Sequence, residues 1–152
     1  MTPDTFFAQA KQAGAITPDA TLDSAYQFGA DPQTATALAT LVLSGQKTAT
    51  TSGFALYRLN HEPLPATGEL DIILDGAGEP VALTVTTAVT VQAYAQVGAA
   101  HAAAEGEGDG SLAYWRRVHD AFFTAEYQAA GLSFDPATAL VVLEHFRVIY
   151  RG

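Results

Sequence analysis

Lys47 is a candidate for catalysis or anion binding because it lies between the end of a predicted helix and the start of a threonine-rich predicted strand. It is one of only two lysines in the 152-residue chain. A lone amine held beside hydroxyls and a carboxylate acts as a general base if burial lowers its pKa, or anchors an anion if it stays charged. The segment KTATTS supplies hydroxyls from Thr48, Thr50 and Thr51. A solvated lysine in a turn is the competing interpretation.

A second chemically promising group is the segment EGEGDG, which places Glu105, Glu107 and Asp109 at alternate positions. Two interpretations stay open, a loop of carboxylates that point into a pocket and a solvated flexible loop. A calcium loop of the EF-hand type is disfavoured, because the position that should hold a bidentate glutamate is Arg116. The acids also count against a phosphate cradle, which needs bare backbone N–H groups.

Glu144 is unusual because it interrupts the apolar run ALVVLEHFRVIY. A period of two places it on the same face as Val142 and Phe146. A carboxylate on an apolar face needs a partner or must stay protonated. We therefore expect Glu144 to point into the interior and to meet a donor near Lys47, such as a threonine hydroxyl or a backbone N–H. A β-bulge that turns it outward is the alternative.

Several classes of site are disfavoured by what the sequence lacks. The absence of cysteine removes disulfides, thiolate metal sites and a cysteine nucleophile. The four histidines show no zinc-site spacing, so the sequence predicts no metal site and no cofactor. No GxSxG motif is present, which disfavours a standard serine hydrolase.

The charge balance limits the partners. Seven Lys plus Arg against sixteen Asp plus Glu give a formal net charge of −9. Because a protein that grips a long nucleic acid makes about six to ten phosphate contacts, long double-stranded DNA is not an expected partner. The N-terminus lacks a signal-peptide pattern, and no apolar run reaches the length of about 18 residues that a membrane span needs. We therefore expect a cytoplasmic protein without a membrane partner.

The N-terminal part is expected to form a helical arm over residues 1–30 that packs on the rest of the chain. Pro3 and the apolar residues Phe6, Phe7 and Ala10 predict a short helix at its start. The remainder of the arm, from residue 16 on, shows no regular pattern.

Two longer helices are predicted from their capping residues. Asp31 before Pro32 is an N-cap followed by a first-turn proline, and the helix should stop near Gly45. Ser111 caps a second helix that runs to about Ala129, with apolar residues every three or four positions. A further, alanine-rich helix is expected over residues 94–104.

Strands are predicted from β-branched composition and from alternation. KTATTS suits a half-buried strand, residues 69–74 and 81–91 alternate around a turn, and residues 140–150 form a strong closing strand. Strands with segregated helices indicate an α+β domain with a curved or barrel-like sheet of about five or six strands flanked by helices.

Two separated segments, LVLSGQKTATTSGFALY and AEGEGDGSLAYWRRVHDAFF, together resemble an ASCH domain. The resemblance rests on Gly-x-Lys-Thr-x-Thr after a helix, a turn before the strand ELDIIL, the Trp-Arg-x-x-His-x-x-Phe-Phe helix and a closing strand, in this order. It implies that residues 31–152 form a PUA-like β-barrel. It also implies a cleft beside the barrel for RNA or a modified nucleoside.

The resemblance also implies a site. A short-chain subgroup of the family removes the acetyl group from acetylcytidine with a Lys, a Thr three residues later and a Glu before the long helix. These roles map onto Lys47, Thr50 and Glu107, with Glu105 and Asp109 as alternatives for the acid. The implied chemistry is metal-independent hydrolysis, with Lys47 as base or charge stabiliser, Thr50 as nucleophile or water-positioning group and Glu107 as proton shuttle.

Other functions remain open. Longer family members act as ribonucleases on single-stranded RNA, and a non-catalytic RNA-binding or nucleoside-binding module or a homodimer through apolar helices also fits. Arg116 is expected to meet a phosphate or to pair with Asp120 four residues on. The full expected substrate-binding set is Thr48, Glu105, Asp109, Arg116 and Glu144.

Overall fold

The computed structural model describes residues 1–152 as one five-stranded sheet with five α-helices and a short 3-10 helix at Tyr94–Gln96. The helices are α1 (Pro3–Gln12), α2 (Pro32–Ser44), α3 (Phe54–Leu59), α4 (Ala99–Glu105) and α5 (Leu112–Ala129). The strands are β1 (Ser24–Gln27), β2 (Ala49–Gly53), β3 (Leu70–Leu74), β4 (Pro80–Ala93) and β5 (Leu140–Tyr150).

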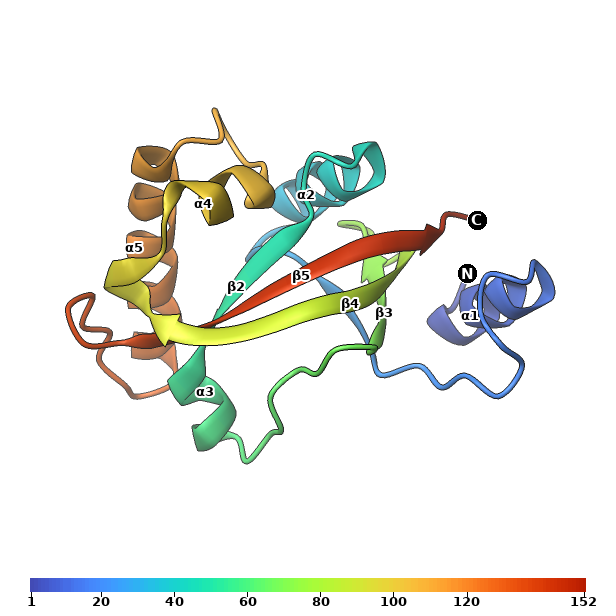
Figure 1. Cartoon of the computed structure of the whole chain (residues 1–152), viewed down its shortest axis with the longest axis horizontal. Helices are drawn as coiled ribbons and strands as arrows, with labels where there is room; N and C mark the ends of the chain where they lie inside the picture. Colours follow the sequence, from blue (N-terminus) through green and yellow to red (C-terminus); the bar gives the residue numbers. More distant parts are fainter.

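The sheet has the order β1-β3-β4-β5-β2. β1 runs parallel to β3, and all other neighbours are antiparallel. The long strands β4 and β5 lie side by side along the long axis of the molecule (Figure 1). Register shifts between β4 and β5, at Leu83/Thr84 and at Thr86/Ala88, bend this ribbon, since a bulge increases the local twist. The result is a curled half-barrel, which confirms the predicted α+β class and curved sheet.

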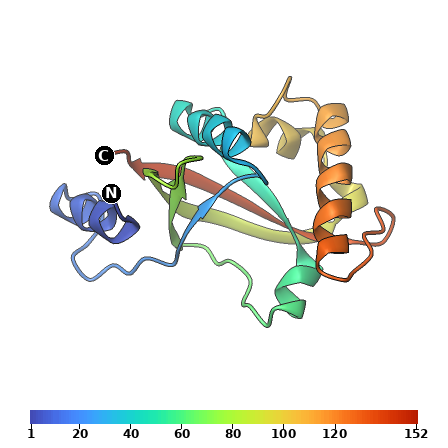
Figure 2. The ribbon, with the colours of Figure 1, turned by 180° about the vertical axis from the view of Figure 1, so that it is seen from behind.

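The helices lie around this sheet, with α4 and α5 at one end and α1 at the other (Figure 1). Seen from behind, α5 stands across the end of the sheet and both termini lie near α1 (Figure 2). Three apolar clusters join the layers. Their largest fully buried apolar members are Tyr94, Phe123, Ile72, Ile73, Leu83 and Val42. No helix combines the length and the hydropathy that crossing a membrane would require.

The predicted caps fix the ends of the helices that border the site. The Asp31 carboxylate accepts a hydrogen bond from the Thr34 N–H at 2.9 Å at the start of α2. Gly45 ends α2 with φ 82°, a left-handed conformation that glycine adopts without the cost of a Cβ. Ser111 accepts from the Tyr114 N–H at 3.1 Å at the start of α5. The end of α2 and the start of α5 therefore lie as predicted.

Three local predictions need correction. The arm over residues 16–30 contains the strand β1, which pairs in parallel with β3. No pattern in the neighbouring sequence predicts this pairing. The helix α3 was not expected between β2 and the proline-rich loop. The predicted helix over residues 94–104 is divided into the short 3-10 turn and α4, because Val97 and Gly98 adopt extended backbone conformations.

The prediction that residues 81–91 alternate between the two faces of the sheet without interruption also needs correction. The register shift between Thr86 and Ala88 places one extra residue in β4, so the residues after it point to the opposite faces. Before the shift both faces are covered, since Ala82, Leu83 and Thr84 are all buried.

Candidate active site

One large cavity lies on the inner side of the half-barrel, with a volume of about 760 Å³. Its lining residues come from β1, α2, β2, α3, β3, α4, α5 and β5 and from the loops between them, so most elements of the fold contribute to the wall. Nine carboxylates line it: Asp23, Asp31, Glu62, Glu69, Asp71, Glu105, Glu107, Glu126 and Glu144. Lys47 is the only lysine in the cavity lining, and no arginine lines the cavity. The cavity is therefore strongly acidic.

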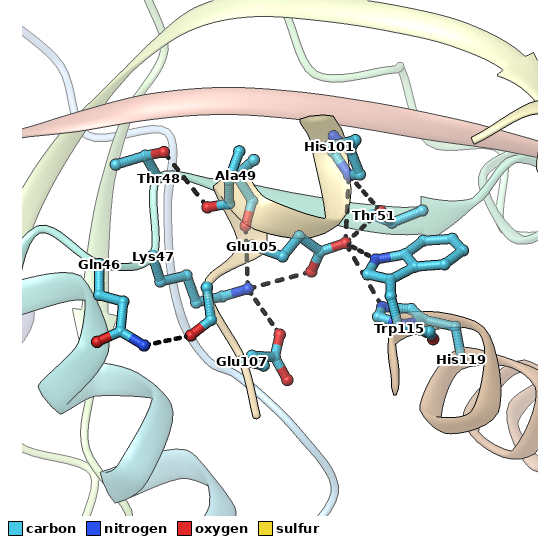
Figure 3. Close-up of polar contacts among 12 residues, drawn as sticks. Gln46, Lys47, Thr48, Ala49, Thr51, His101, Glu105, Glu107, Trp115 and His119 are labelled. Atoms are coloured by element: carbon cyan, nitrogen blue, oxygen red, sulfur yellow. Dashed lines mark hydrogen bonds and ion pairs between the residues drawn. The ribbon is translucent and has the colours of Figure 1, made fainter. Parts of the chain in front are cut away.

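The Lys47 ammonium group lies buried at the wall of this cavity and donates three hydrogen bonds. Its Nζ lies 2.9 Å from the Ala49 carbonyl oxygen, 3.2 Å from Glu105 Oε1 and 2.9 Å from Glu107 Oε2. Figure 3 shows the two carboxylates on adjacent sides of the amine. Because an ammonium has three protons, all of its donors are used. Lys47 is held as a fixed positive charge between two acids.

The end of α2 positions Lys47. After Gly45 the chain turns, and the Lys47 N–H donates to the Leu41 carbonyl oxygen at 3.0 Å. The Lys47 amine also lies 5.0 Å from the centre of the Phe28 ring, within the range of a cation–π contact. The helix end and the aromatic ring together direct the side chain away from solvent.

Glu105 is the most heavily bonded group of the site. Its Oε2 accepts from the Thr51 hydroxyl at 2.6 Å and from Trp115 Nε1 at 2.6 Å. His101 Nε2 and His119 Nε2 lie 3.2 Å and 3.5 Å from the same oxygen. Glu105 thus joins α4, β2 and α5 at one point (Figure 3).

The electrostatic state of Glu105 follows from these contacts. Its side chain is only 2% exposed, and burial alone raises the pKa of a carboxyl group. The hydrogen bond from His101 and the positive charge of Lys47 outweigh burial, so the pKa of Glu105 lies well below its usual value. Glu105 is therefore ionised, and its role is to hold other groups.

His101 completes this cluster with one unsatisfied atom. Thr51 donates its single proton to Glu105, so the contact of 2.8 Å between Thr51 Oγ1 and His101 Nε2 requires the proton to be on Nε2. His101 Nδ1 is the one buried side-chain polar atom without a partner. Its ring contacts that of His145, with centroids 5.6 Å apart. No group of three or more His, Cys, Asp or Glu side chains is arranged to hold a metal ion.

The threonines after Lys47 divide by the alternation of β2. Thr50 lines the cavity, and its hydroxyl makes no hydrogen bond with the protein. Thr51 points to the other face, where it donates to Glu105. Thr48 precedes β2 and donates to the Ala104 carbonyl oxygen at 3.3 Å. Of these three threonines, only Thr50 therefore offers a free hydroxyl to the cavity.

Glu144 lines the cavity as its alternation predicted, but it has no partner. No hydrogen bond or ion pair reaches its side chain, so the expected donor near Lys47 is a wrong prediction. Burial, with the charges of Asp71 and Glu69, raises the pKa of Glu144 to about 7. The expected alternative of a bulge in β5 does not occur at this position, since Glu144 keeps its pairing with Thr50 of β2 and Val89 of β4.

Three of the expected substrate-binding residues lie outside the cavity. Thr48 is bonded to α4, as described above. Asp109 is exposed and accepts from the Ser111 N–H at 2.9 Å, which makes it part of the turn before α5. Arg116 donates to the carbonyl oxygens of Tyr94, Ala95 and Val97. Arg116 forms no ion pair with Asp120 and is instead held by these three carbonyl oxygens.

The cavity also includes polar residues that the sequence did not single out. Tyr26 and Asp71 come from the paired strands β1 and β3, and Tyr57 comes from α3. Because β1 and α3 were not predicted, their tyrosines carried no signal. Asp71 gave one, since it is a carboxylate in an otherwise apolar strand, and it is 5% exposed with Ser24 donating to it at 2.6 Å.

The comparisons with known proteins agree with this architecture. The family model for the ASCH domain matches residues 24–150, which includes β1. The crystal structure of an ASCH domain from Lactobacillus crispatus JV V101 is 35% identical, with a TM-score of 0.90 over 97% of this chain and 94% of that one.

A second crystal structure, of a protein from Enterococcus faecalis V583, is 34% identical, with a TM-score of 0.87 over 95% of this chain and 86% of that one. No curated protein matches the chain. The extent of the family match, together with the identity and coverage of the solved structures, shows that this chain belongs to the ASCH domain family.

Proposed function

We propose that the protein is a hydrolase that removes an acyl group from a nucleoside by breaking an amide bond. The observation that carries the proposal is that the free Thr50 hydroxyl and the Lys47–Glu107 ion pair line the same cavity. A nucleophile, a carboxylate base and a fixed positive charge are the three groups that acyl transfer needs.

We assign the roles from the hydrogen-bonding atoms that each side chain leaves without a protein partner. Thr50 Oγ1 attacks the acyl carbon, and Glu107 takes the hydroxyl proton. Glu107 suits this role because its side chain is 19% exposed and one of its oxygens lies at 2.9 Å from Lys47, which leaves the other oxygen free. Lys47 acts through its charge, since its three protons are already donated.

As the bond between the acyl carbon and nitrogen breaks, Glu107 gives the proton from Thr50 to the nitrogen, which frees the nucleoside and leaves the acyl group as an ester on Thr50. A water molecule that gives a proton to Glu107 then attacks the ester, and Glu107 returns the proton to Thr50 Oγ1 as the acyl group leaves as a carboxylic acid.

In this proposal Glu105 positions Lys47 and does not take part in proton transfer. Its Oε2 accepts from Thr51 and Trp115 and its Oε1 from Lys47, so we assign it no proton exchange with a substrate. It holds the Lys47 amine at 3.2 Å through Oε1 and thereby sets where the positive charge lies. Among the three acids considered from the sequence, Glu107 is the one that we assign to proton transfer.

The charge of the cavity supports a small nucleoside over RNA. Nine carboxylates and one lysine line the cavity, so a phosphodiester backbone would be repelled there. A ribonuclease needs cations along the strand, and Arg116, the nearest expected one, is bonded to backbone carbonyls instead. A nucleoside carries no phosphate and avoids this repulsion.

The test is a chromatographic assay of the purified full-length protein with acylated nucleosides and short single-stranded RNAs. We expect release of the free nucleoside from at least one acylated substrate and no shortening of the RNAs. Lys47→Met should reduce the rate at least about a hundredfold, as expected for loss of a fixed charge at the reacting group. Cleavage of RNA without deacylation would contradict the proposal, as would full activity of Lys47→Met.

A further inference from the structure

Glu144 is placed to contact whatever binds in the cavity. Its side chain is partly buried in the cavity wall and receives no hydrogen bond from the protein. Buried polar groups in proteins are normally hydrogen-bonded, because leaving one without a partner costs free energy. Since a carboxylate oxygen accepts hydrogen bonds, the complementary group on a ligand is an N–H or O–H donor.

The strand register places this carboxylate beside the proposed nucleophile. Glu144 lies directly opposite Thr50 in the antiparallel pair of β2 and β5. Side chains at directly opposite positions leave the same face of the sheet, with Cβ atoms about 4.5–5.5 Å apart. A ligand atom held by Glu144 is therefore next to the Thr50 hydroxyl.

A second free polar group lines the cavity within electrostatic reach of Glu144. The Tyr26 hydroxyl makes no hydrogen bond with the protein, and it interacts with the charges of Glu144 and Asp71. The Tyr57 hydroxyl, by contrast, is already paired with Ser52 at 2.8 Å. Tyr26 keeps its proton in these surroundings and is available as a donor. One acceptor and one donor thus face the cavity together.

This pattern matches one kind of ring edge. In an amino-substituted nucleobase, an exocyclic N–H donor stands beside a ring nitrogen that accepts. An oxo-substituted nucleobase presents carbonyl lone pairs at the position of the amino group, and a carboxylate repels them. The acidic charge contributed by Asp71 and Glu69 strengthens the preference for a donor.

We propose that Glu144 is a specificity-determining residue that accepts a hydrogen bond from the exocyclic nitrogen of an amino-substituted nucleobase. The inference rests on the proposed function, since the acyl group to be removed would be attached to that nitrogen. It also goes further, because it predicts which bases are accepted and names the residue that selects them.

The experiment compares two pairs of nucleosides that differ mainly in an amino or an oxo group, cytidine with uridine and adenosine with inosine. Calorimetric titration of the full-length protein is carried out at a pH of about 8.5, where a carboxylate with a pKa near 7 is ionised. We expect the amino member of at least one pair to bind at least about tenfold more tightly than its oxo partner, the size of a typical base-reading contact.

Two variants identify the residue responsible. Glu144→Gln keeps the shape but adds a donor, so the preference should fall to within about threefold. Asp4→Asn removes a charge of the same sign from the exposed first turn of α1 and should keep the wild-type preference. Glu144→Asp keeps the charge but shortens the side chain, so it should weaken binding of the amino nucleoside while the amino preference remains.

The outcomes separate this inference from the proposed function. Equal binding within both pairs, preference for the oxo members, no binding of any of the four, or an unchanged preference in Glu144→Gln would overturn the role of Glu144. If deacylation is found together with an unchanged preference in Glu144→Gln, only this inference fails. If the preference depends on Glu144 but no acylated nucleoside is hydrolysed, the inference stands and the proposed hydrolase does not.

Discussion

Lys47 and Glu105 are 58 positions apart in the sequence and form an ion pair of 3.2 Å in which the two side chains are 1% and 2% exposed. The pair joins the start of β2 to the end of α4. A buried pair of this kind is sensitive to the loss of either partner, because the remaining charge is left without compensation. The geometry of the proposed active site therefore depends on a carboxylate that we do not expect to react.

The two acids beside Lys47 should differ sharply in their effect on stability. We expect Glu105→Gln to lower the free energy of unfolding by about 3–5 kcal/mol, since it breaks a buried ion pair. Glu107→Gln makes the same chemical change at a more exposed position and should cost less than about 1 kcal/mol. Urea denaturation at pH 7 measures both. Equal losses would contradict the division of roles between the two acids.

The pH dependence of stability should reveal Glu144. Its folded-state pKa of about 7 lies above the reference value of 4.5, so the folded state holds a proton that the unfolded state releases. The contribution of Glu144 to stability therefore falls as the pH rises from about 4.5 to 7.

Glu144→Gln removes this titration. We expect it to match the wild type near pH 4.5 and to exceed it by about 1–3 kcal/mol at pH 8, as a shift of this size implies. Thermal unfolding across this pH range measures the difference. A constant difference between the two proteins at all pH values would show that Glu144 does not titrate near pH 7.

Arg116 should matter for the fold and not for a ligand. Its guanidinium group donates to the carbonyl oxygens of Tyr94, Ala95 and Val97, which fixes the turn between β4 and α4. We expect Arg116→Met to lower the free energy of unfolding by about 1–3 kcal/mol, since several charge-assisted hydrogen bonds are lost. Arg117→Met, at an exposed position one residue on, should have little effect.

Nucleoside affinity provides the second readout for Arg116. Because its side chain lies outside the cavity, the folded Arg116→Met variant should bind nucleosides with the wild-type affinity. A loss of nucleoside affinity without a loss of stability would restore the substrate-binding role first expected for this residue.

The sequence was enough to predict helices with capping residues at their ends and strands with alternating apolar residues. Asp31, Gly45 and Ser111 end or begin helices by capping, and capping depends on residues within one turn. The alternation of residues 140–150 likewise predicted β5. By contrast, β1 is held by its parallel pairing with β3, and no pattern within four residues reveals such a partner.

The site residues also divide into those that the sequence predicted and those whose contacts depend on distant parts of the chain. The resemblance placed Lys47, Thr50 and Glu107 in one group, and all three line the cavity. The partners of Glu105 come from α4, α5 and the segment around β2, so its many contacts became visible only in the structure. Glu144 was noticed because a carboxylate interrupted an apolar run, but its raised pKa depends on burial and on the charges of Asp71 and Glu69, which only the fold brings near.

In the proposed hydrolase the Thr50 hydroxyl attacks the substrate, and kcat/KM for an acylated nucleoside in two variants of Thr50 tests this step most directly. Thr50→Val keeps the shape and removes the hydroxyl, whereas Thr50→Ser keeps the hydroxyl. Thr90→Val, at an exposed strand position, is the matched control. We expect Thr50→Val to lose at least about a hundredfold in kcat/KM and Thr50→Ser to stay within about tenfold of the wild type. Wild-type activity in a folded Thr50→Val protein would contradict the account.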